Sequence, residues 1–188
     1  AGERGRLLLV TTFDARSRTV AHQELKIEQV VRQAQSLGVP LLGVPLWGHT
    51  PYEQRIAEAL ALPASAGVGL GRLCSGDLHL EYVAEWRRQH IGPIAARLGA
   101  TLHAPLWRLP YEALLADLLE GSGTPCTVCA VGDAHAARED GPVARVGERF
   151  DGTLLARLVA AGCDGFGENG EFHTLVKPWE STKADPLA

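Results

Sequence analysis

The densest group of residues able to carry out chemistry lies near the end of the sequence. Residues 165–174 read GFGENGEFHT, with three glycines, two glutamates, a histidine and a threonine. Glycine adopts backbone conformations that other residues rarely reach, so this segment can turn sharply. Two carboxylates three residues apart across such a turn can face one Mg²⁺ or one reacting amine. A hairpin turn with solvated charges is the alternative, but it needs far fewer polar groups. We therefore predict that Glu168 and Glu171 are catalytic, with His173 as a supporting hydrogen-bond donor.

A second candidate group follows the apolar run at residues 70–74. Gly76 and Asp77 lie in the string SGDLHLE at residues 75–81, just before a predicted helix. Glycine permits close approach of a ligand to the backbone, and a carboxylate can bind Mg²⁺. We predict that Gly76 and Asp77 contact a nucleotide and that Asp77 is a metal ligand. Asp77 as an N-cap of the helix stays open as the alternative.

A third candidate group closes the first apolar run. Thr11, Thr12 and Phe13 follow the aliphatic residues that begin at Leu7. Ligands of α/β sheets bind at the carboxyl ends of strands, where hydroxyl groups can reach a nucleotide. We predict that these three residues bind the nucleotide, with ordinary capping of the strand end as the alternative.

The spacing of apolar residues predicts the elements that position these groups. The first half alternates strands with helices: strands at 7–12, 39–44, 70–74 and 101–104, and helices at 23–37, 52–62 and 81–98, the last with a break at Gly92-Pro93. This order is typical of a parallel sheet with helices on its faces. We expect an α/β fold, a Rossmann-like parallel sheet covered by helices on both sides.

The pattern changes after Pro105. We predict helices at 110–120 and 153–161, strands at 124–131 and 171–176, and a loop at 133–146. These elements predict a smaller C-terminal α/β lobe. We place the boundary near residue 100, with a nucleotide-binding domain at 1–100 and an acceptor-substrate domain at 101–188.

Composition and charge narrow the class of function. The chain has 188 residues, 46% of them hydrophobic, with a net charge of −4. That charge and the lack of a basic block argue against a nucleic-acid partner. No apolar run is long enough to cross a bilayer, so we expect no membrane partner and a cytoplasmic protein. Cys126 and Cys129 have a metal-like spacing, but their apolar surroundings favour packing in or beside a strand.

The motifs in their order resemble the diphthine–ammonia ligase group of PP-loop ATP pyrophosphatases. The resemblance rests on Gly76-Asp77-Leu78 with Glu81, on Pro105-Leu106-Trp107, and on GENGEFHT at residues 167–174. It covers residues 7–176 and implies the adenine nucleotide alpha hydrolase type of Rossmann-like fold. The implied enzyme is an ATP-dependent carboxylate–ammonia ligase that uses Mg²⁺ and releases AMP and pyrophosphate.

The resemblance also leaves several points open. The family's phosphate-binding loop, Ser-Gly-Gly-Lys-Asp-Ser, does not occur in the 188 residues, and we expect it to precede residue 1. The implied partners are ATP, ammonia and a carboxylate-bearing substrate, whose identity the sequence does not determine. A homodimer stays open as the oligomeric state. The alternative function is an ATP-binding sensor, or another non-catalytic nucleotide-binding protein, of the same fold.

Overall fold

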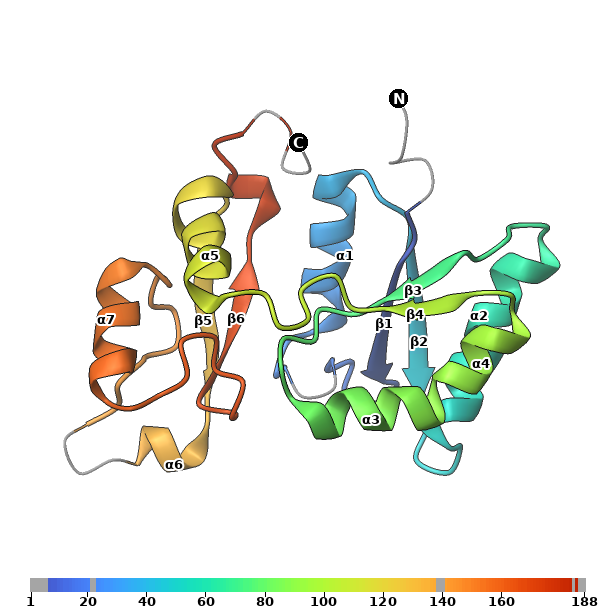
Figure 1. The fold of residues 1–188 in the computed structure, drawn as a ribbon, viewed down its shortest axis with the longest axis horizontal. Coiled ribbons are helices and arrows are strands. Elements are labelled where there is room, and N and C mark those ends of the chain that lie inside the picture. The colour runs from blue at the N-terminus through green and yellow to red at the C-terminus, as the bar shows by residue number, and fades with distance from the viewer. Residues whose placement is uncertain (1–6, 21–22, 138–140, 184, 186–188) are drawn as a thin grey trace. The chain divides into compact units, whose positions relative to one another are not determined.

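The computed structural model of the chain describes residues 7–20, 23–137, 141–183 and 185 (Figure 1). Its internal contacts divide the chain into two compact units. One unit joins residues 1–43 to residues 111–188, and the other consists of residues 44–110. The predicted nucleotide-binding domain at 1–100 and acceptor-substrate domain at 101–188 stay predictions.

The described residues combine short strands with helices, which confirms the α/β class. The strands are β1 (Leu9–Asp14), β2 (Leu41–Leu46), β3 (Arg72–Cys74), β4 (Thr101–His103), β5 (Cys126–Val131) and β6 (Phe172–Val176). The α-helices are α1 (Ile27–Leu37), α2 (Tyr52–Ser65), α3 (Glu81–His90), α4 (Gly92–Arg97), α5 (Tyr111–Ala116), α6 (Asp133–Ala136) and α7 (Gly152–Ala160). A π-helical turn, η2 (Asp117–Gly121), follows α5, and a 3-10 turn, η3 (Pro178–Glu180), follows β6.

The strands pair in twos. β1 pairs with β2, β3 pairs with β4, and β5 pairs with β6. The β3–β4 pair is parallel, with Leu73 opposite Leu102. The β5–β6 pair is antiparallel, and its register shifts between Val128 and Ala130. A shift of this kind changes which residues of a strand face the core.

Glycine and proline end helices where the sequence predicts. Gly38 and Gly162 follow α1 and α7 with φ of 65° and 72°, a left-handed conformation that favours glycine. The predicted break at Gly92-Pro93 is confirmed, because α3 ends at His90 and α4 begins at Gly92. Proline lacks the N–H that continues a helix, so it is tolerated in the first turn of α4. The predicted loop at 133–146 contains one short helix, α6.

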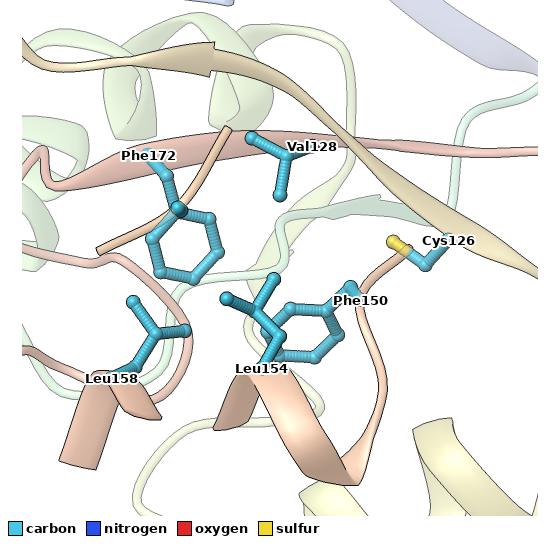
Figure 2. Packing of buried hydrophobic residues seen from close by; sticks show 7 residues of the cluster. Cys126, Val128, Phe150, Leu154, Leu158 and Phe172 are labelled. Carbon is cyan, nitrogen blue, oxygen red and sulfur yellow. The ribbon is translucent and has the colours of Figure 1, made fainter. Parts of the chain in front are cut away.

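The core of the first unit lies between the β5–β6 pair and α7. It is built from Cys126, Val128, Ala144, Phe150, Leu154, Leu158 and Phe172. Figure 2 shows the Leu154 and Leu158 side chains of α7 directed toward the Phe150 and Phe172 rings. The two rings stack with centroids 5.7 Å apart. Cys126 is therefore a core residue of a strand, as predicted.

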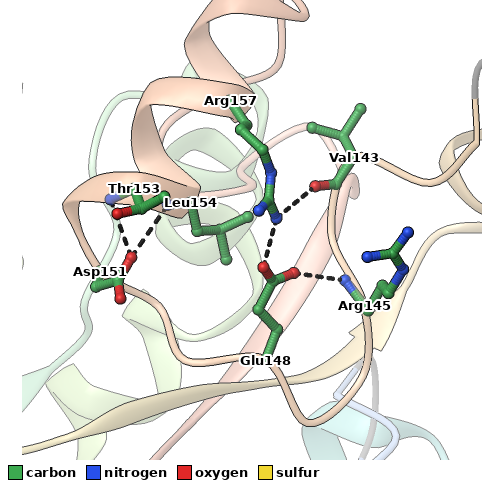
Figure 3. Close-up of polar contacts among 7 residues, drawn as sticks. All are labelled: Val143, Arg145, Glu148, Asp151, Thr153, Leu154 and Arg157. Atoms are coloured by element: carbon green, nitrogen blue, oxygen red, sulfur yellow. Dashed lines mark hydrogen bonds and ion pairs between the residues drawn. The ribbon is translucent and has the colours of Figure 1, made fainter.

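Polar contacts fix the segment that leads into α7 (Figure 3). Asp151 caps the helix, because its carboxylate accepts the N–H groups of Thr153 and Leu154 at 2.9 and 3.1 Å. Glu148 accepts from the Arg157 guanidinium and from the backbone N–H of Arg145. These bonds hold the segment over the core.

Two side chains of α1 contact the end of β6 and the turn that follows it. The Gln33 side-chain amide donates to the carbonyl of Val176 at 2.8 Å. The Arg32 guanidinium lies 4.0 Å from the centroid of the Trp179 ring, a distance suited to a cation–π contact. An early helix is thereby joined to the last strand and turn of the described chain.

The second unit packs α2, α3 and α4 with the β3–β4 pair. Its buried residues include Ile56 and Leu60 of α2 and Ile94 and Ala95 of α4. The Trp86 ring of α3 stacks on His90, with centroids 5.1 Å apart.

We expect Leu154→Ala to lower the free energy of unfolding by about 2–5 kcal/mol, because truncating a fully buried leucine removes apolar burial and leaves a cavity. Leu154 is 1% exposed. Urea denaturation followed by circular dichroism measures the change. Val159→Ala on the same helix is the matched control, since Val159 is 62% exposed and should change stability little. Equal effects of the two substitutions would contradict the position assigned to Leu154.

Candidate functional site

The loop between α7 and β6 is organised by the carboxylate of Glu171. Glu171 is buried, and its Oε1 accepts the backbone N–H of Asp164 at 2.8 Å. Its Oε2 accepts the backbone N–H of Asn169 at 3.0 Å. Burial alone would raise the pKa of Glu171, but these N–H donors outweigh it and hold the pKa below its ordinary value. Glu171 is therefore a charged group that fixes the shape of its own loop.

Asp164 forms a second set of hydrogen bonds in the same loop. Its Oδ1 accepts the backbone N–H groups of Phe166 at 2.8 Å and Glu168 at 3.3 Å. Its Oδ2 accepts the hydroxyl of Tyr111 at 3.1 Å. The Tyr111 ring packs edge-on against Phe166, with centroids 5.0 Å apart. The start of α5 is thereby attached to the loop.

Three carboxylates lie close enough to Tyr111 to affect the pKa of its hydroxyl. Burial, followed by the negative charges of Asp164, Glu168 and Glu171, raises the pKa of Tyr111. The Tyr111 hydroxyl therefore stays protonated and acts as a donor. Three acidic side chains thus lie near the Tyr111 hydroxyl in this part of the first unit.

Two close backbone approaches require glycine in this region. Gly167 has φ of 74°, and a Cβ there would lie 2.6 Å from the carbonyl oxygen of Phe172. A Cβ on Gly132, which follows β5, would lie 2.3 Å from the carbonyl oxygen of Gly170. Gly132 also donates its N–H to the carbonyl of Glu171 at 2.9 Å. The loop thus rests directly on the end of β5.

The three predicted catalytic residues fall in this loop and the strand that follows. Glu168 is half-buried in the turn. His173 lies in β6, opposite Ala130 of β5. Since neighbouring residues of a strand face opposite sides, the buried Phe172 places His173 on the face away from the core. The predicted catalytic roles of Glu168, Glu171 and His173 stay predictions.

The predicted nucleotide-binding residues Thr11, Thr12 and Phe13 lie inside β1, which runs two residues further than the sequence indicates. All three are half-buried. The Phe13 ring packs over β2, because a Cβ on Gly43 would lie 3.3 Å from its Cε1 atom. The strand ends at Asp14, whose carboxylate accepts the N–H groups of Arg16 and Ser17.

Gly76 and Asp77 belong to the second unit, between β3 and α3. The Asp77 carboxylate accepts both Nε and Nη2 of Arg87, at 2.5 and 2.9 Å, and the Ser75 hydroxyl at 2.8 Å. Burial would raise the pKa of Asp77, but the bonds from Arg87 and Ser75 lower it below its ordinary value. The interpretation of Asp77 as an N-cap is wrong, because Leu80 is the N-cap residue of α3 and no side chain caps this helix.

The surroundings of Asp77 bear on its predicted metal role. A guanidinium occupies both carboxylate oxygens, and within the described ranges no three His, Cys, Asp or Glu residues gather as a metal site would require. A magnesium ion on Asp77 would have to displace Arg87. The metal role of Asp77 stays a prediction.

Sequence reasoning missed two residues of the loop network, Asp164 and Tyr111. Asp164 directly precedes the glycine-rich run, and an aspartate before a turn often accepts the N–H two residues on. Tyr111 begins a predicted helix and carries no local signal of its contact, since Asp164 lies 53 residues away.

No family model matches the sequence, and a search of curated proteins finds no match. In the part of the chain that the structure describes, none of the helices has the length and apolar character that crossing a membrane requires.

We expect Glu171→Gln to destabilise the protein by about 1.5–3 kcal/mol at neutral pH, because it removes hydrogen bonds to a charged group. Since the folded pKa of Glu171 is lowered, its contribution is full above the ordinary value of 4.5 and is lost as the pH falls through the folded pKa. The wild type should therefore lose stability relative to the variant on acidification. Urea denaturation across this pH range measures the difference.

Glu112→Gln, at an exposed position on α5, is the control and should leave the pH profile unchanged. Parallel pH profiles for the wild type and Glu171→Gln would show that the carboxylate does not stabilise the loop.

We expect Gly132→Ala to cost about 1–3 kcal/mol, because the added methyl group meets the backbone of Gly170 and forces it to move. Gly152→Ala, in the first turn of α7, meets no atom within 4 Å and should be neutral or stabilising. Thermal unfolding compares the two variants. A neutral Gly132→Ala would rule out the close approach.

Proposed function

We propose that the protein is an ATP-dependent ligase that joins a carboxylate to ammonia and releases AMP and pyrophosphate. The order of its motifs supports this, as does an α/β chain whose first strand, helix and second strand suit a Rossmann-like sheet. ATP supplies the activation of the carboxylate by transfer of AMP. The protein's own task is to hold the reacting groups and to manage protons.

The observation that carries the proposal is the group of Asp164, Glu168 and Glu171 around the Tyr111 hydroxyl. Ammonia exists mainly as ammonium at neutral pH, and it must lose a proton before it can act as a nucleophile. Negative charges attract the cation, and a carboxylate among them can accept the proton.

The hydrogen bonds of Glu171 bear on its proposed role. Both oxygens of Glu171 accept backbone N–H groups, so this carboxylate is a weak base and acts as a positioning residue. Glu168 is the proposed base that deprotonates ammonium. His173 is the proposed supporting donor on the adjoining strand.

Thr11, Thr12 and Phe13 of β1 stay the residues proposed to bind nucleotide, as do Gly76 and Asp77 before α3. Phe13 supports the strand by packing over Gly43, so we assign polar contacts with the nucleotide to the two threonine hydroxyls. Mg²⁺ enters the proposal as the partner of the ATP phosphates. The Asp77–Arg87 pair is proposed to keep the turn before α3 in a fixed conformation.

We expect Glu168→Gln to lower the rate of ammonium-dependent AMP release by about 10²–10⁴-fold, the usual contribution of a general base. The assay supplies the full natural protein with ATP, Mg²⁺, ammonium and a panel of carboxylates, and measures AMP by chromatography. Glu112→Gln is the matched control and should keep the wild-type rate, because Glu112 is exposed outside the loop.

A wild-type rate for Glu168→Gln with every active carboxylate would remove Glu168 from the reaction. Binding of ATP with no AMP formed from any carboxylate would overturn the ligase and favour a nucleotide sensor.

A further inference from the structure

A thiol and an imidazole lie next to each other at the base of the glycine-rich loop. The Cys163 sulfur is 3.8 Å from Nδ1 of His135, and both side chains are half-buried. His135 lies on α6 and Cys163 follows α7, and both belong to the first unit.

Backbone hydrogen bonds fix both positions. The N–H of His135 donates to the carbonyl of Gly132 at 2.9 Å, and the N–H of Cys163 donates to the carbonyl of Leu158 at 2.9 Å. Gly162, just before Cys163, takes the left-handed conformation that turns the chain at the end of α7. The approach of the two side chains is thus set by ordered backbone on each side.

We propose that Cys163 and His135 form a reactive thiol–imidazole pair, which makes Cys163 a site of covalent modification by soft electrophiles. In the tautomer that carries its proton on Nε2, Nδ1 accepts the thiol proton. The resulting thiolate is the nucleophilic form of cysteine. This inference does not rest on the proposed ligase function.

Iodoacetamide alkylates a thiol in one displacement step. The Cys163 sulfur attacks the methylene carbon, a carbon–sulfur bond forms, and the carbon–iodine bond breaks to release iodide. The proton of the thiol stays on His135 until solvent removes it.

The other cysteines provide internal references. Cys126 is 3% exposed in the core, and burial raises the pKa of its thiol. Burial also raises the pKa of Cys129, which is half-buried in β5. Cys74 is exposed in the second unit, so it reports the rate of a solvent-accessible thiol.

The experiment treats the whole chain with limiting iodoacetamide at neutral pH and follows each cysteine by peptide mass spectrometry. We expect Cys163 to react about 5–10-fold faster than Cys74, despite its lower exposure, because His135 lies where it can take the thiol proton as the sulfur attacks. In His135→Ala the rate at Cys163 should fall to that of Cys74 or below, while the rate at Cys74 stays unchanged.

Two further variants keep the test decisive. His135→Gln can still hydrogen-bond the sulfur but cannot hold its proton, so Cys163 should slow as it does in His135→Ala. His49→Ala, at an exposed position in the second unit, should change neither rate. Reaction of the core residue Cys126 in His135→Ala would show that this variant has unfolded. The rate at Cys163 in His135→Gln then decides the test. An unchanged Cys163 rate in the folded His135 variants would overturn the proposal.

Discussion

The loop between α7 and β6 must hold several carboxylates close together, and the ionised Glu171 side chain makes this possible. A buried charge is costly unless donors surround it. Here the donors are the N–H groups of Asp164 and Asn169, which belong to the same loop. The loop conformation and the charge of Glu171 therefore depend on each other. Loss of either would release the backbone that carries Glu168 and the aspartate that binds Tyr111.

This polar loop is joined directly to the hydrophobic core. Phe172 follows Glu171 without any spacer, and it is 2% exposed against the α7 leucines. At the other end, Cys163 packs against the same core. A short loop held at both ends by packed residues has little freedom, which is the condition a reactive site needs for geometric precision. The capped start of α7 extends this rigidity to the helix before the loop.

Most elements could be predicted from the sequence, because apolar spacing, glycine and proline act locally. The break at Gly92-Pro93 and the end of α1 at Gly38 are examples. The partners of the candidate residues could not be predicted in this way. Asp77 binds Arg87 of the helix that follows it, and the Tyr111 hydroxyl bonds Asp164, 53 residues later in the sequence. Such pairs follow from tertiary packing, so local patterns identified Asp77, Glu168 and Glu171 without showing which of them are already bonded, and they missed Asp164.

The first unit is assembled from two separated stretches of chain, with residues 44–110 inserted between them. Gln33 of α1 bonds the carbonyl of Val176, 143 residues later. During translation α1 leaves the ribosome well before β6 is made, so its contact with Val176 cannot form until then. The inserted unit has no such delay, because residues 44–110 form one continuous stretch that is made before residue 111. The insertion can therefore complete its own contacts earlier in synthesis than the first unit, which needs both of its stretches.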